Sequence, residues 1–483
     1  MLLGVVAAAF VLYASVAIVP NVKRFLLATD FRAFYCAGQA TREHVDPYLQ
    51  APLAACQQSI GRALGHPDVD VRPAPHPGYD MALFALFSVP PYVAAALCWT
   101  LVLICAYLSA VWSLARLLRL PYYVPAVALM LTDLYESSVW GQVVPLIIAA
   151  LCLSAYALAL RRVVLAAVAA AFAMIEPHVG LPACAALFVW EPRSRAPLGA
   201  AALVAAALAV AAIGPFANIE YFRDVLPAHA LAELPTRAQF SFSVVLHYFG
   251  MPDGRAAKLG MLSYVVMTAA GIVVAGFVAR RRAAPAGIVL LPPAFAVFGG
   301  VFMHHTEIAV AIPSALFLAV VPERHNVRLV AFASLFALCA YWEESIGRSL
   351  LLLDGLFLGV LTAWFAAREG FSDRRALLAT MPALAAYVLG LAALGHTSHR
   401  PVVFASPPTT FVAQNHLRPN LASTEDGLTL RRDRAAKGMS PWDIARKVPS
   451  WLALIMLCGA GLAVVLLRPA ARRRSEAVPH GAA

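Results

Sequence analysis

The chain has 483 residues, of which 61% are hydrophobic and only 13% are charged, and its mean hydropathy is +0.75. A water-soluble globular protein usually carries about 45–50% apolar residues, so this composition excludes that class and indicates an integral membrane protein. The net charge of +11 does not indicate a nucleic-acid partner, because most basic residues form short clusters between apolar runs.

Apolar runs of about 15 to 25 residues recur along the chain, without the long alternation of a lipid-facing β-barrel. They predict an all-α polytopic membrane protein with roughly 12–14 transmembrane helices. In chain order we expect segments near residues 2–20, 89–115, 121–134, 142–160, 162–176, 178–190, 197–216, 259–279, 284–303, 307–321, 328–342, 349–366, 376–395 and 451–467.

Arginine clusters lie between these segments on alternate sides, and the positive-inside rule makes those sides cytoplasmic. Both chain ends are then cytoplasmic. Lys23 and Arg24 oppose this orientation, but they belong to a long loop, and long loops cross the membrane largely regardless of charge. The first run lacks a basic N-terminal region, so we interpret it as a retained helix and not as a cleaved signal peptide. The clusters include Arg116, Arg119, Arg161, Arg162, Arg280, Arg281, Arg282, Arg472, Arg473 and Arg474.

This orientation divides the chain into alternating membrane and polar parts. We expect membrane helices at 1–20, 89–216, 259–395 and 451–467, and a basic cytoplasmic tail at 468–483. Three long segments then lie outside, at 21–88, 217–258 and 396–450, where ordered loops with short interfacial helices are expected. Function in such a protein usually lies on these loops.

Asp30 is the candidate for chemistry. It follows the first apolar run by about ten residues, so it lies near a membrane face, where an ionised carboxylate avoids the cost of burial in lipid. A carboxylate there can take a proton from a substrate. The alternative is that Asp30 caps the helix that follows it, since Asp is a favoured N-cap residue, and the two roles are compatible.

Other acidic residues and histidines near helix ends gather on the same outer side. A transporter would place polar groups near the bilayer midplane in two related halves, and the sequence shows no internal repeat, with Asp354 the main charge well inside a span. Polar groups that converge at one interface suit an enzyme whose substrate arrives in the outer leaflet. The group comprises Asp30, Asp133, Glu136, Glu176, His178, His304, His305, Glu307, Glu343 and Glu344.

The order of several short motifs resembles glycosyltransferase family 87 of the membrane-embedded GT-C superfamily. These motifs lie between about residues 10 and 320. They are Asp30-Phe31-x-x-Phe34-Tyr35-x-Ala37 with Asp46-Pro47-Tyr48, the Tyr79 to Pro90 segment with Trp99, Gly141-Gln142-Val143-Val144-Pro145-Leu146, Ile175-Glu176-Pro177, and His304-His305 before Pro313. The chain departs from the family in having Glu176 where a lysine is frequent, and the segment 396–450 matches no family pattern.

The resemblance implies a GT-C-type fold and an inverting hexosyltransferase, with mannose the sugar of the best-known members. The donor would be a polyprenyl-phosphate sugar, and the acceptor a glycan or glycolipid at the outer face of a bacterial-type inner membrane. Such a reaction needs one general base, for which Asp30 is suited, and groups that stabilise the leaving phosphate. The residues implied to bind substrate are His304, His305, Arg32, Tyr35, Gln142, Glu176 and His178.

Simpler interpretations of these residues stay open. Gln142 can form a helix-packing hydrogen bond, Glu176 and His178 can mark a polar helix break, and the two histidines at 304 and 305 can be an interfacial pair. Arg32, with Lys23 and Arg24, supplies the positive charges nearest to Asp30 in the sequence.

No metal or organic cofactor is expected, because the sequence has neither a Gly-rich phosphate loop nor zinc-ligand spacing. Cys36 and Cys56 share the first outer loop, where an oxidising compartment allows a disulfide, although Cys36 can instead pack in a helix. Two other functions remain: a transporter or flippase of a lipid-linked sugar, and a structural subunit of an envelope complex.

Overall fold

The computed structural model describes residues 28–67, 69–130, 137, 139–236, 239–300, 302–339, 359, 361–362, 364–365, 368, 411–437 and 447–467. In these residues the fold is all-α, with isolated β-bridges only between Leu49 and Leu421 and between Gln239 and His304. The predictions for Lys23, Arg24, Asp133, Glu136, Glu343, Glu344 and Asp354 lie outside the described residues.

Four helical stretches in the described part are long and apolar enough to cross a membrane: α6 (Tyr92–Leu118), the stretch Pro192–Ala232, α15 (Asp253–Arg282) and α24 (Val448–Leu466). The shorter apolar helices are α5 (Gly78–Phe87), α9 (Val144–Ala159), α10 (Val163–Phe172), α11 (Pro177–Trp190), α16 (Gly287–Gly299), α17 (Ile312–Val320) and α18 (His325–Cys339). The prediction of an all-α polytopic membrane protein is thereby confirmed.

In the described residues, these helices follow the predicted segments closely from residue 89 to residue 339 and again at 451–467. The predicted segment 349–366 lies mostly outside the described residues. The predicted segments 2–20 and 376–395 lie outside the described residues. Leu97, Leu101 and Leu108 on α6 are exposed, and α12 (Arg195–Glu220) exposes most of its length. Such faces suit contact with lipid chains, which replace the apolar neighbours that a soluble protein would need.

The stretch Pro192–Ala232 is not a straight helix. Gly214 has a φ of 76°, which breaks α12 just before Pro215, and a π-helical turn at Tyr221–Val225 leads into α13 (Leu226–Ala232). Glycine takes this left-handed conformation without steric cost, and proline cannot continue the hydrogen bonding of the preceding turn. The chain therefore changes direction here, and α13 leaves the apolar helices.

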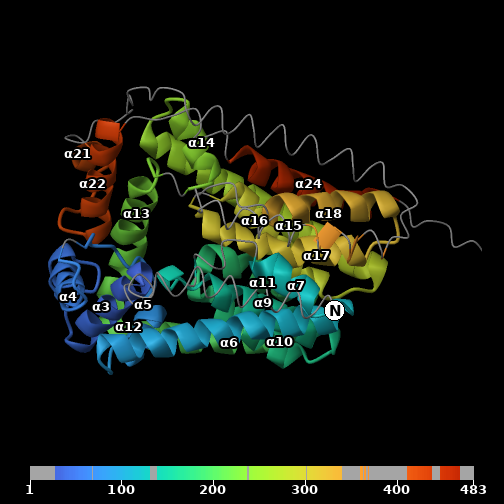
Figure 1. Cartoon of the computed structure of the whole chain (residues 1–483), viewed down its shortest axis with the longest axis horizontal. Helices are drawn as coiled ribbons and strands as arrows, with labels where there is room; N and C mark the ends of the chain where they lie inside the picture. The colour runs from blue at the N-terminus through green and yellow to red at the C-terminus, as the bar shows by residue number, and fades with distance from the viewer. Residues whose placement is uncertain are drawn as a thin grey trace, which may run out of the picture.

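The helices of the predicted outer loops gather at one end of the molecule (Figure 1). α3 (Thr29–Arg42) and α4 (Gln50–Ala63) lie beside α5, and α22 (Ala422–Lys437) lies against α13, with the short α21 (Phe411–Gln414) next to it. A disulfide between Cys36 and Cys56 joins α3 to α4, with a Cα–Cα distance of 5.7 Å. Segments that lie far apart in the sequence thus build one polar end of the molecule. α14 (Phe242–Tyr248) packs against the start of α15.

Candidate active site

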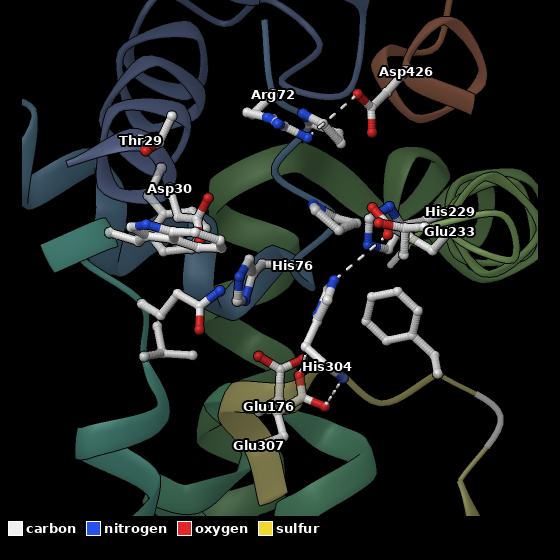
Figure 2. Close-up of a pocket in the computed structure, with 18 of the residues that line it drawn as sticks. Thr29, Asp30, Arg72, His76, Glu176, His229, Glu233, His304, Glu307 and Asp426 are labelled. Atoms are coloured by element: carbon white, nitrogen blue, oxygen red, sulfur yellow. Dashed lines mark hydrogen bonds and ion pairs between the residues drawn. The ribbon is translucent and has the colours of Figure 1, made fainter. Parts of the chain in front are cut away.

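A cavity of about 260 Å³ lies at this polar end, between α3, α13, α22 and the start of the helical turn η5 (His305–Ala311). Its volume is close to the lower limit of small-molecule sites, about 300 Å³. Figure 2 shows that acidic and basic side chains dominate its walls. The lining residues include Thr29, Asp30, Phe34, Arg72, His76, Trp140, Gln142, Glu176, His229, Glu233, Phe302, His304, Glu307, Asp426 and Leu430.

Aromatic packing fixes Asp30 at this cavity. The next residue, Phe31, is fully buried and stacks on Trp99 of α6, with ring centroids 5.1 Å apart. α3 begins at Thr29 after Ala28, whose φ is 30°, and no side chain caps the helix. Asp30 therefore lies in the first turn of α3 without acting as its N-cap, and its carboxylate is available to the cavity.

Gly141 brings Gln142 next to Asp30. It has a φ of 75°, and a Cβ atom on it would lie 2.6 Å from Cβ of Phe31, so only glycine fits against α3 at this point. Trp99 donates a hydrogen bond from Nε1 to the Gly141 carbonyl oxygen at 2.7 Å. The Gln142 side chain then hydrogen-bonds the carboxylate of Asp30.

The carboxyl group of Asp30 is more basic than an ordinary aspartate. Burial raises its pKa, and the nearby Glu233 carboxylate raises it further. The Gln142 hydrogen bond and the positive charges of Arg72 and His304 oppose this change without cancelling it. A raised pKa makes the ionised carboxylate a better proton acceptor, which is what a general base needs.

Arg72 lies above Asp30 in the view of Figure 2. Its backbone is held by Gln57, whose side chain donates to the Arg72 carbonyl at 2.7 Å and accepts from the Arg72 N–H at 3.0 Å. Its guanidinium lies 3.8 Å from Asp70 and 3.8 Å from Asp426. Burial lowers the pKa of Arg72, but the carboxylates around it outweigh burial and raise it, so the side chain is a fixed positive charge at the cavity.

Histidines and glutamates alternate along the opposite wall. His304 lies 3.6 Å from Glu233 and 3.7 Å from Glu307, and His178 lies 3.2 Å from Glu307 and 3.3 Å from Glu176. Glu307 also accepts a hydrogen bond from the His304 backbone N–H at 3.0 Å. Burial lowers the pKa of His304, but its contacts with Glu233 and Glu307 outweigh burial and hold that pKa well above its ordinary value, so His304 carries a positive charge at neutral pH.

Glu176, His178 and Glu307 offer ligand atoms within 4.8 Å of one another, a spacing that can accommodate a divalent cation. Both ring nitrogens of His178 already face a carboxylate. These ion pairs explain the cluster without a metal ion.

Comparison with known families gives a match for the central part of the chain. Residues 77–303 match the model of glycosyltransferase family 87. This part of the chain is similar to that family. The match confirms the resemblance, agrees with the GT-C assignment and indicates a glycosyltransferase. No curated protein and no solved structure matches the chain.

The family match covers only part of the cavity wall. Gln142, Glu176, His229 and Glu233 lie inside the matched residues, whereas Asp30, Arg72, His304 and Asp426 lie outside them. The glycosyltransferase therefore completes its cavity with side chains that come before and after the family segment.

Four of the predicted site residues line the cavity together: Asp30, Gln142, Glu176 and His304. Figure 2 shows Asp30 on one wall and Glu176 with His304 on the opposite one. Gln142 lines the cavity and hydrogen-bonds Asp30. The structure brings these residues together, although three long stretches of chain separate them in the sequence. Their roles in substrate binding and catalysis stay predictions.

The other four predicted residues do not line the cavity. The guanidinium of Arg32 is buried and donates to the Asp70 carbonyl oxygen at 2.9 Å, and Tyr35 donates to the Pro90 carbonyl oxygen at 3.0 Å. His178 contacts the cavity residues Glu176 and Glu307, and His305 packs against the Trp140 ring. Their predicted substrate contacts stay predictions.

Sequence reasoning missed Arg72, His76, His229, Glu233 and Asp426. Arg72 and His76 belong to the stretch Arg-Pro-Ala-Pro-His-Pro. Its alternating prolines favour an extended backbone, which is the signal of an ordered loop that could have pointed to these two residues. His229 and Glu233 are four residues apart, a spacing that places two side chains on one helical face. Asp426 lies in a segment rich in charge, where nothing in the local sequence distinguishes it.

Proposed function

We propose that this glycosyltransferase moves a hexose, mannose in particular, from a polyprenyl-phosphate sugar to an acceptor at the extracytoplasmic face, with inversion. The observation that carries the proposal is that Asp30, a carboxylate with a raised pKa, shares one cavity with two positive groups, Arg72 and His304. A base and cations around one small space are what transfer from a phosphate-linked donor requires.

The chemistry assigns a role to each wall. Asp30 removes the proton from an acceptor hydroxyl, whose oxygen attacks the anomeric carbon of the donor sugar. The bond from that carbon to the phosphate oxygen breaks, and the lipid phosphate leaves with the electron pair. Arg72 and His304 stabilise the negative charge that develops on it. Because attack and departure occur on opposite faces of the carbon, one carboxylate is enough and no covalent sugar intermediate is needed.

An apolar groove supports a lipid-linked donor. It has a volume of about 750 Å³ and lies between α11 and α12, with Pro77 and Tyr79 at its edge. His76, the residue before Pro77, lines the catalytic cavity. A long isoprenoid chain in this groove can therefore continue into a phosphate at the cavity. The groove's other lining residues include Met174, Leu181, Cys184, Phe188, Leu198, Ala202 and Phe222.

A transporter or flippase of a lipid-linked sugar is the alternative. Its best sequence candidate, Asp354, lies outside the described residues. The position of the cavity favours transfer over transport. The residues of α9 and α11 that line the cavity lie where these helices start, at Val144 and Glu176, and not in the middle of the helices.

The experiment is a release assay with purified protein in lipid vesicles, polyprenyl-phosphate mannose and an alkyl mannoside acceptor. We expect polyprenyl phosphate to appear together with the extended glycoside. Asp30→Asn should lower turnover by about 10²- to 10⁴-fold, the usual contribution of a general base. The matched control is Asp70→Asn, which removes an exposed carboxylate beside Arg72. Movement of intact donor between leaflets without phosphate release would contradict the proposal.

A further inference from the structure

Asp426 of α22 is a buried carboxyl group at the cavity that the proposed reaction does not use. It is only 9% exposed and lines the same cavity as Asp30. Its Oδ1 atom lies 3.8 Å from the guanidinium of Arg72. Its Oδ2 atom is buried and accepts no hydrogen bond from any residue that the structure describes.

The fold does not need this carboxyl group to hold α22 in place. Arg431, one turn further along, forms an ion pair with Asp253 of α15 at 2.8 Å and lies 4.1 Å above the Phe411 ring. Gly427 lets the helix approach α13, since a Cβ atom there would lie 2.8 Å from the Ala232 side chain. These contacts hold α22 in place without Asp426, whose side chain lines the cavity.

A buried acceptor atom without a partner is costly, so it normally marks a place where a ligand or ordered water binds. The ligand chemistry follows from charge. In its ionised form the carboxylate repels phosphate, which disfavours the donor phosphate as its partner, and it accepts strongly from hydroxyl groups. Burial raises the pKa of Asp426 to about 7, so at neutral pH the group can also donate a hydrogen bond.

We propose that Asp426 and Leu430 form a sugar-binding subsite on α22, in which the Asp426 carboxyl group hydrogen-bonds hydroxyl groups of a hexose. Leu430 lies one helical turn from Asp426, lines the same cavity and offers an apolar surface beside it. The hexose belongs either to the donor or to the acceptor. This inference rests on the proposed function, and it makes α22, which lies outside the matched residues 77–303, a determinant of sugar specificity.

The test compares Asp426→Asn with Glu425→Gln, which removes the neighbouring carboxylate on the same helix outside the cavity. Two KM values are measured: for polyprenyl-phosphate mannose in donor hydrolysis without acceptor, and for octyl α-mannoside at saturating donor. A lost hydrogen bond to a charged group predicts a rise of about 10- to 100-fold in one KM for Asp426→Asn only. A rise in the hydrolysis KM assigns the donor hexose to Asp426, and a rise in the acceptor KM assigns the acceptor.

Leu430→Trp is the second variant, because it fills the same subsite without removing a buried charge. It should raise the same KM as Asp426→Asn, and it decides the question alone if Asp426→Asn does not fold. The inference is overturned if the wild type is active and neither KM changes by more than about twofold, well below the loss of one hydrogen bond. Absence of phosphate release by the wild type would instead contradict the proposed function itself.

Discussion

The Nε2 atom of His304 lies 3.6 Å from Oε2 of Glu233, and this contact joins the turn before η5 to α13 (Figure 2). Together with the contact to Glu307, it holds the pKa of His304 well above its ordinary value. His305 is 3% exposed and packs edge-on against Trp140 at a centroid distance of 5.9 Å. Two adjacent histidines therefore have different surroundings, and they make a matched pair for mutation.

His304→Gln should lower turnover by about 10- to 100-fold, because a glutamine keeps hydrogen bonding but loses the charge that faces the leaving phosphate. His305→Gln should change turnover less than His304→Gln and act mainly on the melting temperature. The measurement is initial rate at saturating donor, with melting followed by intrinsic fluorescence. Equal rates for the two variants would contradict the assignment of His304 to the phosphate.

Arg72→Gln should raise the KM for the polyprenyl-phosphate donor by about 10- to 100-fold, since it removes a fixed cation from the cavity. Arg72→Lys keeps a point charge without the planar fork of a guanidinium and should recover part of the affinity. Arg62→Gln on the exposed face of α4 is the control for net charge. An unchanged donor KM in Arg72→Gln would place the phosphate elsewhere.

Turnover should depend on pH through Asp30. The group acts as a base only when ionised, so activity rises as the pH rises through its pKa, which burial places above the ordinary aspartate value. The Gln142 hydrogen bond lowers this pKa. Gln142→Ala should therefore move the acid limb of the pH–rate profile to higher pH, while Gln39→Ala, on the outer part of α3, leaves the limb in place. A shift of the limb to lower pH would contradict the claim that the Gln142 hydrogen bond lowers the pKa of Asp30.

The Cys36–Cys56 disulfide closes a loop with a sequence separation of 20 residues. A disulfide that closes a loop of this size stabilises the folded protein by about 3 kcal/mol, because it lowers the entropy of the unfolded chain. Cys56→Ser should lower the melting temperature, and a reducing agent should lower that of the wild type by a similar amount. Cys98→Ser, at an exposed position of α6, serves as the control. Equal melting temperatures with and without reductant would show that the bridge does not stabilise the fold.

Much of the fold could be predicted because the bilayer imposes long apolar runs, and the positions of the described helices between residues 89 and 339 follow directly from these runs. The same logic located Asp30, Glu176 and His304. Glu176 and His304 lie at the edge of an apolar run, and Asp30 follows one by about ten residues, so a charged group at these positions is conspicuous.

Arg72 and Asp426 could not be found in this way. Both belong to polar segments, in which a charged residue is ordinary and carries no signal. Only the tertiary contact between the two segments makes them a pair. Arg32 is a predicted site residue because it lies near Asp30 in the sequence. Side chains two residues apart on a helix point in different directions, however, and the Arg32 guanidinium donates to the Asp70 carbonyl oxygen.

The packing of α22 against α13 has a consequence for biosynthesis. A ribosome that has made the chain as far as His304 has supplied Asp30, Arg72 and the histidine wall, but the helix that closes the cavity has yet to be translated. The cavity wall is therefore complete only when α22 has been made and has docked on α13, and a premature stop codon before residue 411 leaves a fragment whose cavity lacks Asp426 and Leu430.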